Sequence, residues 1–167
     1  MHPQPPLDPR KGEFDAVAHH AQGRFAPHGV MEVFRQGNVI RGYASGPFNI
    51  EFMTAWGKMW GAQLQQRGDP GKLLIATGFS ESVVASLDAI SSFKALMGRA
   101  KALLPADTEH IWLIKDKVEG RILMLPLLKS AMETNSVAIE VYSDEVAFEA
   151  RIAAFSKASQ ISQLPLP

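Results

Sequence analysis

Apolar residues change their spacing along this chain, and the changes predict alternating strands and helices. Residues 30–34 and 39–44 are rich in β-branched and aromatic side chains and flank the turn sequence at 36–38, Gln-Gly-Asn, so they predict a β-hairpin. Residues 72–76 and 111–114 are short, mostly apolar runs, which are typical of strands covered on both faces. These four segments therefore predict the main strands of one sheet.

Between the strands, apolar residues recur at intervals of three and four, as in amphipathic helices. After the hairpin, Asn49 is a natural N-cap, because its side-chain oxygen can accept a hydrogen bond from a free backbone N–H. The helix that it begins carries a broad apolar face made of Phe52, Met53, Trp56, Met59 and Trp60. Further helices are predicted ahead of Pro105, over residues 121–134 and after Asp144, which is a second natural N-cap.

With a last strand at 137–142, the elements predict one α/β domain. We expect a mostly parallel sheet of about four to five strands with an N-terminal β-hairpin and about four helices. The domain is expected to span residues 23–158. Residues 1–22 are expected to form a proline-rich N-terminal arm, with a short helix as an alternative, and residues 159–167 a C-terminal tail.

Composition narrows the classes of function. The chain has 167 residues, of which 46% are hydrophobic, so it can bury a sizeable core. Its formal net charge is zero, which gives no electrostatic attraction to nucleic acid and little repulsion against self-association. The absence of cysteine excludes disulfides, thiolate catalysis and cysteine-based zinc sites. No apolar stretch approaches the length of about 18 residues that a membrane span needs, and we expect a cytoplasmic protein.

Three short motifs accompany the order of the elements. They are Gly46-Pro47-Phe48-Asn49 before the first core helix, Glu119-Gly120-Arg121 at the start of the third, and Val141-Tyr142 followed by Asp144-Glu145. Together with the order of elements, they resemble the STAS-like fold, and within it the SpoIIAA-like branch of small bacterial domains related to anti-sigma-factor antagonists. The resemblance implies a non-enzymatic regulatory or binding domain, without a cofactor, that acts through contacts with a protein partner or as a dimer.

Regulatory members of that family carry a phosphorylated serine in an Asp-Ser-Ser-Gly-like segment at the start of a helix. In this chain the corresponding region contains Asp88 and several serines, but no glycine follows the serine pair, so the resemblance selects no single position. It implies a phosphorylation site or a partner-binding loop among Ser80, Ser82, Ser86, Ser91 and Ser92.

Two other functions follow from the residues themselves. The apolar face formed by Met53, Trp56, Met59 and Trp60 is broad enough to line a cavity for a small apolar ligand, as well as to fill the core or an oligomer interface. A small serine hydrolase would use Ser80, which follows a buried strand in a sequence close to Gly-x-Ser-x-Gly. Ser82 stands at the last glycine position of that motif, and its side chain would obstruct the tight turn, so a helix or turn cap is the simpler interpretation.

Two further groups of polar residues have ordinary explanations. Arg121 follows the carboxyl end of a predicted parallel strand, where it is a candidate anion contact or part of a solvated loop. His19, His20 and His28 are close in sequence, but adjacent histidines on a helix point in different directions, so we interpret them as surface residues. We therefore assign no catalytic residue and no metal ligand.

Overall fold

A single mixed sheet organises the chain. The computed structural model describes residue 10, residues 12–65 and residues 71–161. Within them, a six-stranded sheet has its strands side by side in sequence order. The strands are β1 (Glu13–Ala16), β2 (Val30–Gln36), β3 (Val39–Ser45), β4 (Leu74–Phe79), β5 (Glu109–Ile114) and β6 (Glu140–Tyr142). The helices are η1 (Val17–His20, a 3₁₀ turn), α1 (Ile50–Gln65), α2 (Leu87–Leu103), α3 (Arg121–Thr134) and α4 (Glu145–Ile161).

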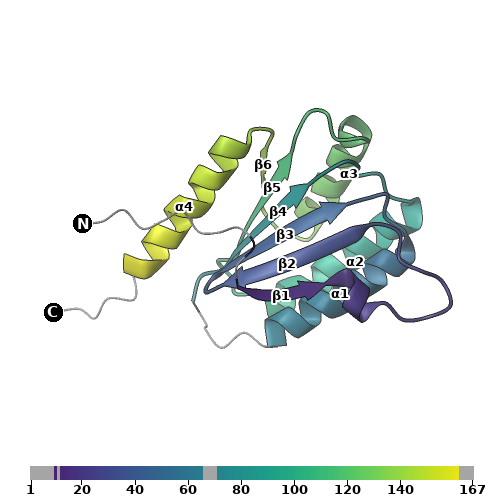
Figure 1. Cartoon of the computed structure of the whole chain (residues 1–167), viewed down its shortest axis with the longest axis horizontal. Helices are drawn as coiled ribbons and strands as arrows, with labels where there is room; N and C mark the ends of the chain where they lie inside the picture. Colours follow the sequence, from purple (N-terminus) through teal and green to yellow (C-terminus); the bar gives the residue numbers. More distant parts are fainter. Residues whose placement is uncertain (1–9, 11, 66–70, 162–167) are drawn as a thin grey trace.

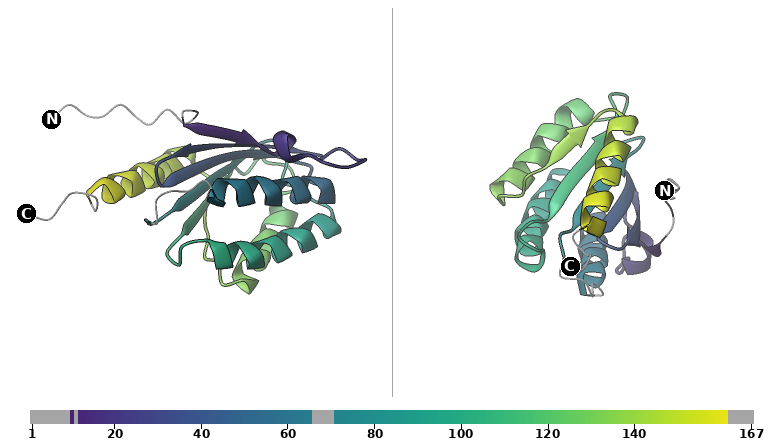
Figure 2. Two further views of the ribbon diagram at one scale, coloured as in Figure 1. Left: turned by 90° about the horizontal axis from the view of Figure 1, so that it is seen from below. Right: turned by 90° about the vertical axis from the view of Figure 1, so that its left-hand side faces the viewer.

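The sheet changes from antiparallel to parallel at β3. Strands β1, β2 and β3 pair antiparallel, and β3 to β6 pair parallel (Figure 1). Each parallel connection passes through one helix, because parallel neighbours require a crossover. Helices α1, α2 and α3 cover one face of the sheet and α4 covers the other (Figure 2). The expected α/β class, the N-terminal hairpin and the four α-helices are therefore confirmed.

The two faces of the sheet have separate hydrophobic cores. The larger core lies between the sheet and α1, α2 and α3. The smaller one lies between the sheet and α4, and consists of Val39, Leu74, Ala76, Ile111, Leu113, Phe148, Ile152 and Phe155. Because β4 and β5 contribute apolar residues to both cores, they read as continuous apolar runs in the sequence.

Polar caps fix where three helices begin. The side-chain oxygen of Asn49 accepts a hydrogen bond from the Phe52 N–H at 2.9 Å, and that of Asp144 accepts from the Ala147 N–H at 2.8 Å. Both N-caps predicted from the sequence are thus confirmed. Ser86 caps α2 in the same way, by accepting from the Ala89 N–H.

The N-terminal part of the sheet differs from the expectation. The described residues contain six strands instead of four to five, because β1 lies in the segment that the sequence assigned to the arm. Phe14 of β1 lies opposite Phe34 of β2, with ring centroids 5.1 Å apart, and this contact holds the short strand at the edge of the sheet. The last strand is also shorter than residues 137–142, since only Glu140–Tyr142 pairs with β5.

Candidate functional site: an apolar cavity between two helices and the sheet

A cavity of about 260 Å³ lies inside the larger core. The sheet forms its floor, with Ile75, Thr77, Phe79, His110 and Trp112. Helices α1 and α2 form its walls, and Leu128 and Met132 of α3 close it on one side. Nearly all of these side chains are apolar, so the cavity is chemically suited to a small hydrophobic molecule.

Aromatic rings from four elements make the cavity wall continuous. Trp56 of α1 lies 5.6 Å from Phe93 of α2, and Phe93 lies 6.4 Å from Trp112 of β5, measured between ring centroids. Phe79 of β4 contacts the edge of Trp112 at 5.7 Å, and Trp60 contacts Trp56 at 6.1 Å. Rings in these tilted and edge-on arrangements are rigid and interact favourably, so they maintain the shape of the cavity.

Two glycines of α1 set where the cavity opens. A Cβ atom at Gly57 would lie 2.7 Å from a methyl carbon of Leu96, so α1 and α2 touch closely there. A Cβ atom at Gly61, one turn further along, would meet no atom of a described residue within 4 Å. Across from this open space, Leu103 of α2 lines the cavity and remains 68% exposed. The mouth therefore lies between the last turns of α1 and α2.

A few polar groups lie within this apolar wall. His110 and Thr77 are both buried and line the cavity. Burial lowers the pKa of His110 from 6.5 to about 4, because the charged imidazolium loses its hydration, so the ring is neutral at pH 7. The indole N–H of Trp60 is buried and, among the described residues, has no hydrogen-bond acceptor. These groups make the cavity capable of hydrogen bonding as well as apolar contact.

A second, more polar hollow of about 610 Å³ lies on the α4 face, at the carboxyl ends of β3, β4 and β5. Buried Arg41 donates two hydrogen bonds of 2.8 Å to Glu149 of α4. Burial disfavours the charge of the guanidinium, but the Glu149 carboxylate outweighs that effect and raises the pKa of Arg41. Lys115 forms an ion pair with Glu145. Because these charges neutralise each other, we interpret the hollow mainly as the place where α4 docks on the sheet.

Only part of the predicted apolar face borders the cavity. Met53, Trp56 and Trp60 line it. Met59 is fully buried and does not, because it points into packed core. Sequence reasoning missed the contributions of Phe93, His110 and the other residues of α2 and β5. Their apolar spacing was visible, but nothing local shows that they face the same space as Trp56.

The predicted serines are spread over several environments. Ser80 and Ser91 are exposed, and Ser92 is partly buried. Ser82 is buried, and its hydroxyl oxygen accepts a hydrogen bond from the Val84 N–H at 3.1 Å. Ser86 is engaged as the N-cap of α2. Ser86 is exposed as well, so the serines that are exposed and whose hydroxyls bind no other described residue are Ser80 and Ser91.

The arrangement does not bring a catalytic pair together around Ser80. His110 is the only histidine after Ser80 in the sequence, and it lies opposite Ile75 in the parallel register of β4 and β5. Ser80 follows Ile75 by five residues, which corresponds to about 16 Å along a strand. That distance is far beyond hydrogen-bond reach, so His110 does not serve as a base for Ser80 in this structure.

The side chain of Arg121 already has partners. Its Nε donates a hydrogen bond of 3.0 Å to the Ile114 carbonyl, and its guanidinium lies 3.2 Å from the Asp116 carboxylate. An incoming anion would compete with both. The structure thus places Arg121 where it ties α3 to the end of β5.

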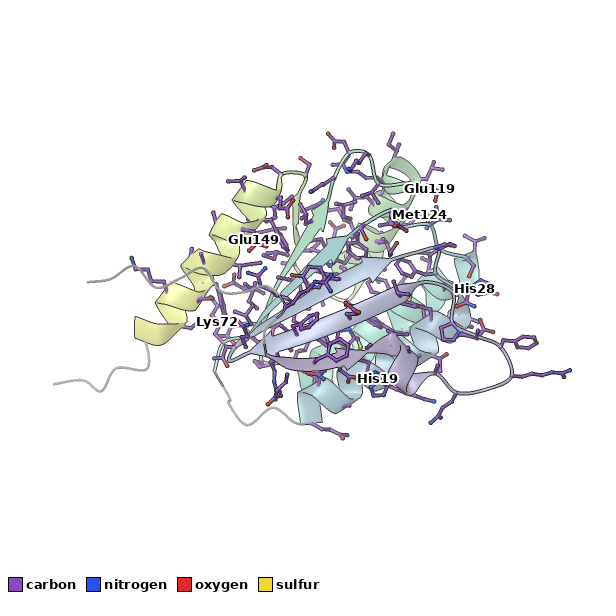
Figure 3. The ribbon with its side chains drawn as sticks, in the orientation of Figure 1. His19, His28, Lys72, Glu119, Met124 and Glu149 are labelled. Atoms are coloured by element: carbon purple, nitrogen blue, oxygen red, sulfur yellow. The ribbon has the colours of Figure 1, made fainter. Side chains whose placement is uncertain are left out.

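The N-terminal histidines belong to a local polar cluster. His20 Nε2 lies 2.9 Å from Asp15 Oδ2, and His19 Nδ1 lies 3.2 Å from Asp15 Oδ1. Gln63 of α1 also donates to Asp15, so the cluster joins β1 and η1 to α1. His28 lies apart from His19, in the segment that leads to β2 (Figure 3). Within the described ranges, no group of three or more suitable side chains could hold a metal ion.

Comparison with known proteins places the chain in no family. No family model, no curated protein and no solved structure matches it significantly. In the part of the chain that the structure describes, no helix has the length and apolar character required to cross a bilayer. The geometry of the cavity and of the surface is therefore what points to a function.

Proposed function

We propose that this chain binds and carries a small apolar molecule in the cavity between α1, α2 and the sheet. The observation that carries the proposal is the 260 Å³ of space beneath Trp56 and Trp60 that side chains leave unfilled. Packed cores contain few voids larger than a water molecule, so space of this size is unusual for a purely structural core. The mouth beside Gly61 supplies an entry route.

Energetics support the same proposal. Empty volume in a closed core lowers stability, because the side chains that line it lose packing contacts. The enclosed part of this cavity carries a cost of that kind. A ligand that fills the cavity would recover part of this free energy as binding affinity. Such a loss of stability is understandable when the space has a use.

The proposal is tested with a variant that blocks the mouth of the cavity. We expect Gly61→Phe to weaken binding of octanol at least tenfold, because the ring would occupy the open space at the entrance. Gly61→Ala is the matched control and should bind octanol normally, with stability raised by about 0.5–1 kcal/mol through better helix propensity. Isothermal titration calorimetry and tryptophan fluorescence measure binding, since Trp56, Trp60 and Trp112 all border the cavity.

Two outcomes would contradict the proposal. One is a wild-type protein that shows neither heat nor a fluorescence change with octanol or any similar small apolar probe. The other is a Gly61→Phe variant that keeps a normal melting temperature and still binds octanol with unchanged affinity, since binding would then occur elsewhere on the protein.

A second candidate function is the regulatory one implied by the STAS-like resemblance, and a specific surface favours it. Leu87 at the start of α2 is 78% exposed, and Ile122 and Leu123 at the start of α3 are 85% and 76% exposed. The loops before these helices pair through Ser82 and Glu119, so the two helix starts lie side by side. A second copy of the chain is the expected occupant, because the formal net charge of zero opposes association little.

The self-association prediction is tested by sedimentation equilibrium. Wild-type protein should be a dimer, and Ile122→Lys combined with Leu123→Lys should be a monomer, since buried lysines would lose their hydration at the interface. Val146→Lys is the matched control, because Val146 of α4 is equally exposed, at 77%, but lies on the opposite face of the sheet from α2 and α3. A monomeric wild type, or a Val146→Lys variant that dissociates equally, would remove this candidate.

A further inference from the structure

A positive charge borders the mouth of the cavity. Arg99 of α2 is the only residue with a full charge at pH 7 among the described residues that line the cavity. Its side chain is exposed, and within the described ranges it forms no ion pair or hydrogen bond. Arg99 lies in the last two turns of α2, the same part of the helix that borders the mouth at Leu103. An unpaired guanidinium at the rim of an apolar cavity favours an anionic group on the ligand.

A second observation points independently to a hydrogen-bond acceptor on the ligand. The Trp60 side chain lines the cavity and is 8% exposed, yet its indole N–H has no acceptor among the described residues. A buried donor without a partner costs about 1–3 kcal/mol. Trp60 is the immediate neighbour of Gly61, so it lies at the mouth end of α1. Two donors without acceptors among the described residues, Trp60 and Arg99, therefore line the cavity from the last two turns of α1 and α2.

The remaining polar groups of the lining do not favour a cationic ligand. His110 and Thr77 are the other lining residues with polar side chains, and neither carries a negative charge. The described part of the lining contains no carboxylate. An ammonium group on a ligand would face the positive charge of Arg99 without compensation.

We propose that the ligand is a monocarboxylate with a medium-length apolar tail, whose head is held at the mouth by Arg99 and the Trp60 N–H and whose tail fills the aromatic cavity. This inference rests on the proposed carrier function and adds the chemical class of the ligand. A volume of 260 Å³ accommodates roughly nine non-hydrogen atoms at a liquid-like 30 Å³ each. The octanoate tail, with seven carbon atoms beyond the carboxylate, fits within that volume.

The test compares three probes with the same tail, namely octanoate, octanol and octylamine. At pH 7.5 and low ionic strength, octanoate should bind about fivefold more tightly than octanol, the gain expected for a partly exposed ion pair. Octylammonium should bind weakest, since it offers no acceptor to Trp60 and is repelled by Arg99. The preference for octanoate should shrink as salt is added.

Variants of α2 assign the preference to one residue. Arg99→Gln should bring the affinity for octanoate down to the affinity of the same variant for octanol. Arg99→Lys should keep most of the preference. Lys101→Gln is the matched control, because Lys101 is an exposed cation on the same helix that does not line the cavity, and it should behave like wild type.

The outcomes separate this inference from the function on which it rests. If octanol binds and Gly61→Phe blocks it, but octanoate binds no more tightly or Arg99→Gln has no effect, the carboxylate inference is wrong and the carrier function stands. If none of the three probes binds to the wild-type protein, both fail. Preference for octanoate that disappears only in Arg99→Gln supports the inference.

Discussion

Lowering the pH from 7 to about 4 should reduce the free energy of unfolding by about 3 kcal/mol through His110 alone. The pKa of His110 falls from 6.5 to about 4 on folding, because burial among apolar side chains penalises the imidazolium. Between these two values the unfolded chain binds a proton that the folded chain does not. Proton binding therefore favours unfolding between pH 4 and 6.5. The contribution of neutral His110 to the free energy of unfolding is fully present only above pH 6.5.

The measurement is urea unfolding at a series of pH values. His110→Gln should lose the slope between pH 4 and 6.5, since glutamine fills similar space and does not titrate. His28→Gln, a change at an exposed histidine, should keep it. A His110→Gln variant whose stability falls with pH as steeply as that of the wild type would contradict the prediction.

Asp15 affects stability in a different pH range. Burial raises the pKa of this carboxyl, but hydrogen bonds from His20, Gln63 and the Ala16 N–H outweigh burial and bring the pKa below its ordinary value of 3.8. The contribution of Asp15 is therefore present above pH 3.8 and is lost as the pH falls further. The pH ranges in which Asp15 and His110 change the free energy of unfolding hardly overlap, so a pH series distinguishes the two effects.

Local signals in the sequence were sufficient for most of the fold. Asn49 and Asp144 cap helices as predicted, because a cap depends on a side chain and a backbone N–H only three residues away. The hairpin around Gly37 follows from turn chemistry in the same local way. By contrast, β1 was missed, because four residues are too few for a clear alternation and its place depends on pairing with β2.

The cavity could be predicted only in part, for a physical reason. The broad apolar face of α1 is visible in the sequence, and three of its four predicted residues border the space. Whether such a face packs solidly or leaves a void depends on side chains from distant elements, here Phe93 and Trp112. The positions of Arg99 and His110 at the cavity likewise follow from tertiary packing, and no short-range pattern indicates them.

The other large effect concerns α4. Ile152→Ala should lower the free energy of unfolding by about 2–5 kcal/mol, because Ile152 is fully buried at the centre of the smaller core. Phe148 and Phe155 lie one turn to either side on the same helix face, so these three side chains form the apolar contact of α4 with the sheet. Neighbouring side chains have little freedom to close the gap that alanine leaves, since the strands below are held by the sheet.

Urea unfolding measures this effect, with Val146→Ala as the control on the same helix. Val146 is 77% exposed, so its change should stay within about 0.5 kcal/mol. Ile152→Ala protein that remains folded should still bind octanol like the wild type, because α4 and the cavity lie on opposite faces of the sheet. A loss of stability no larger than that of Val146→Ala would mean that α4 is not docked as described. If folded Ile152→Ala protein binds octanol more weakly than the wild type, the two faces of the sheet are coupled through β4 and β5.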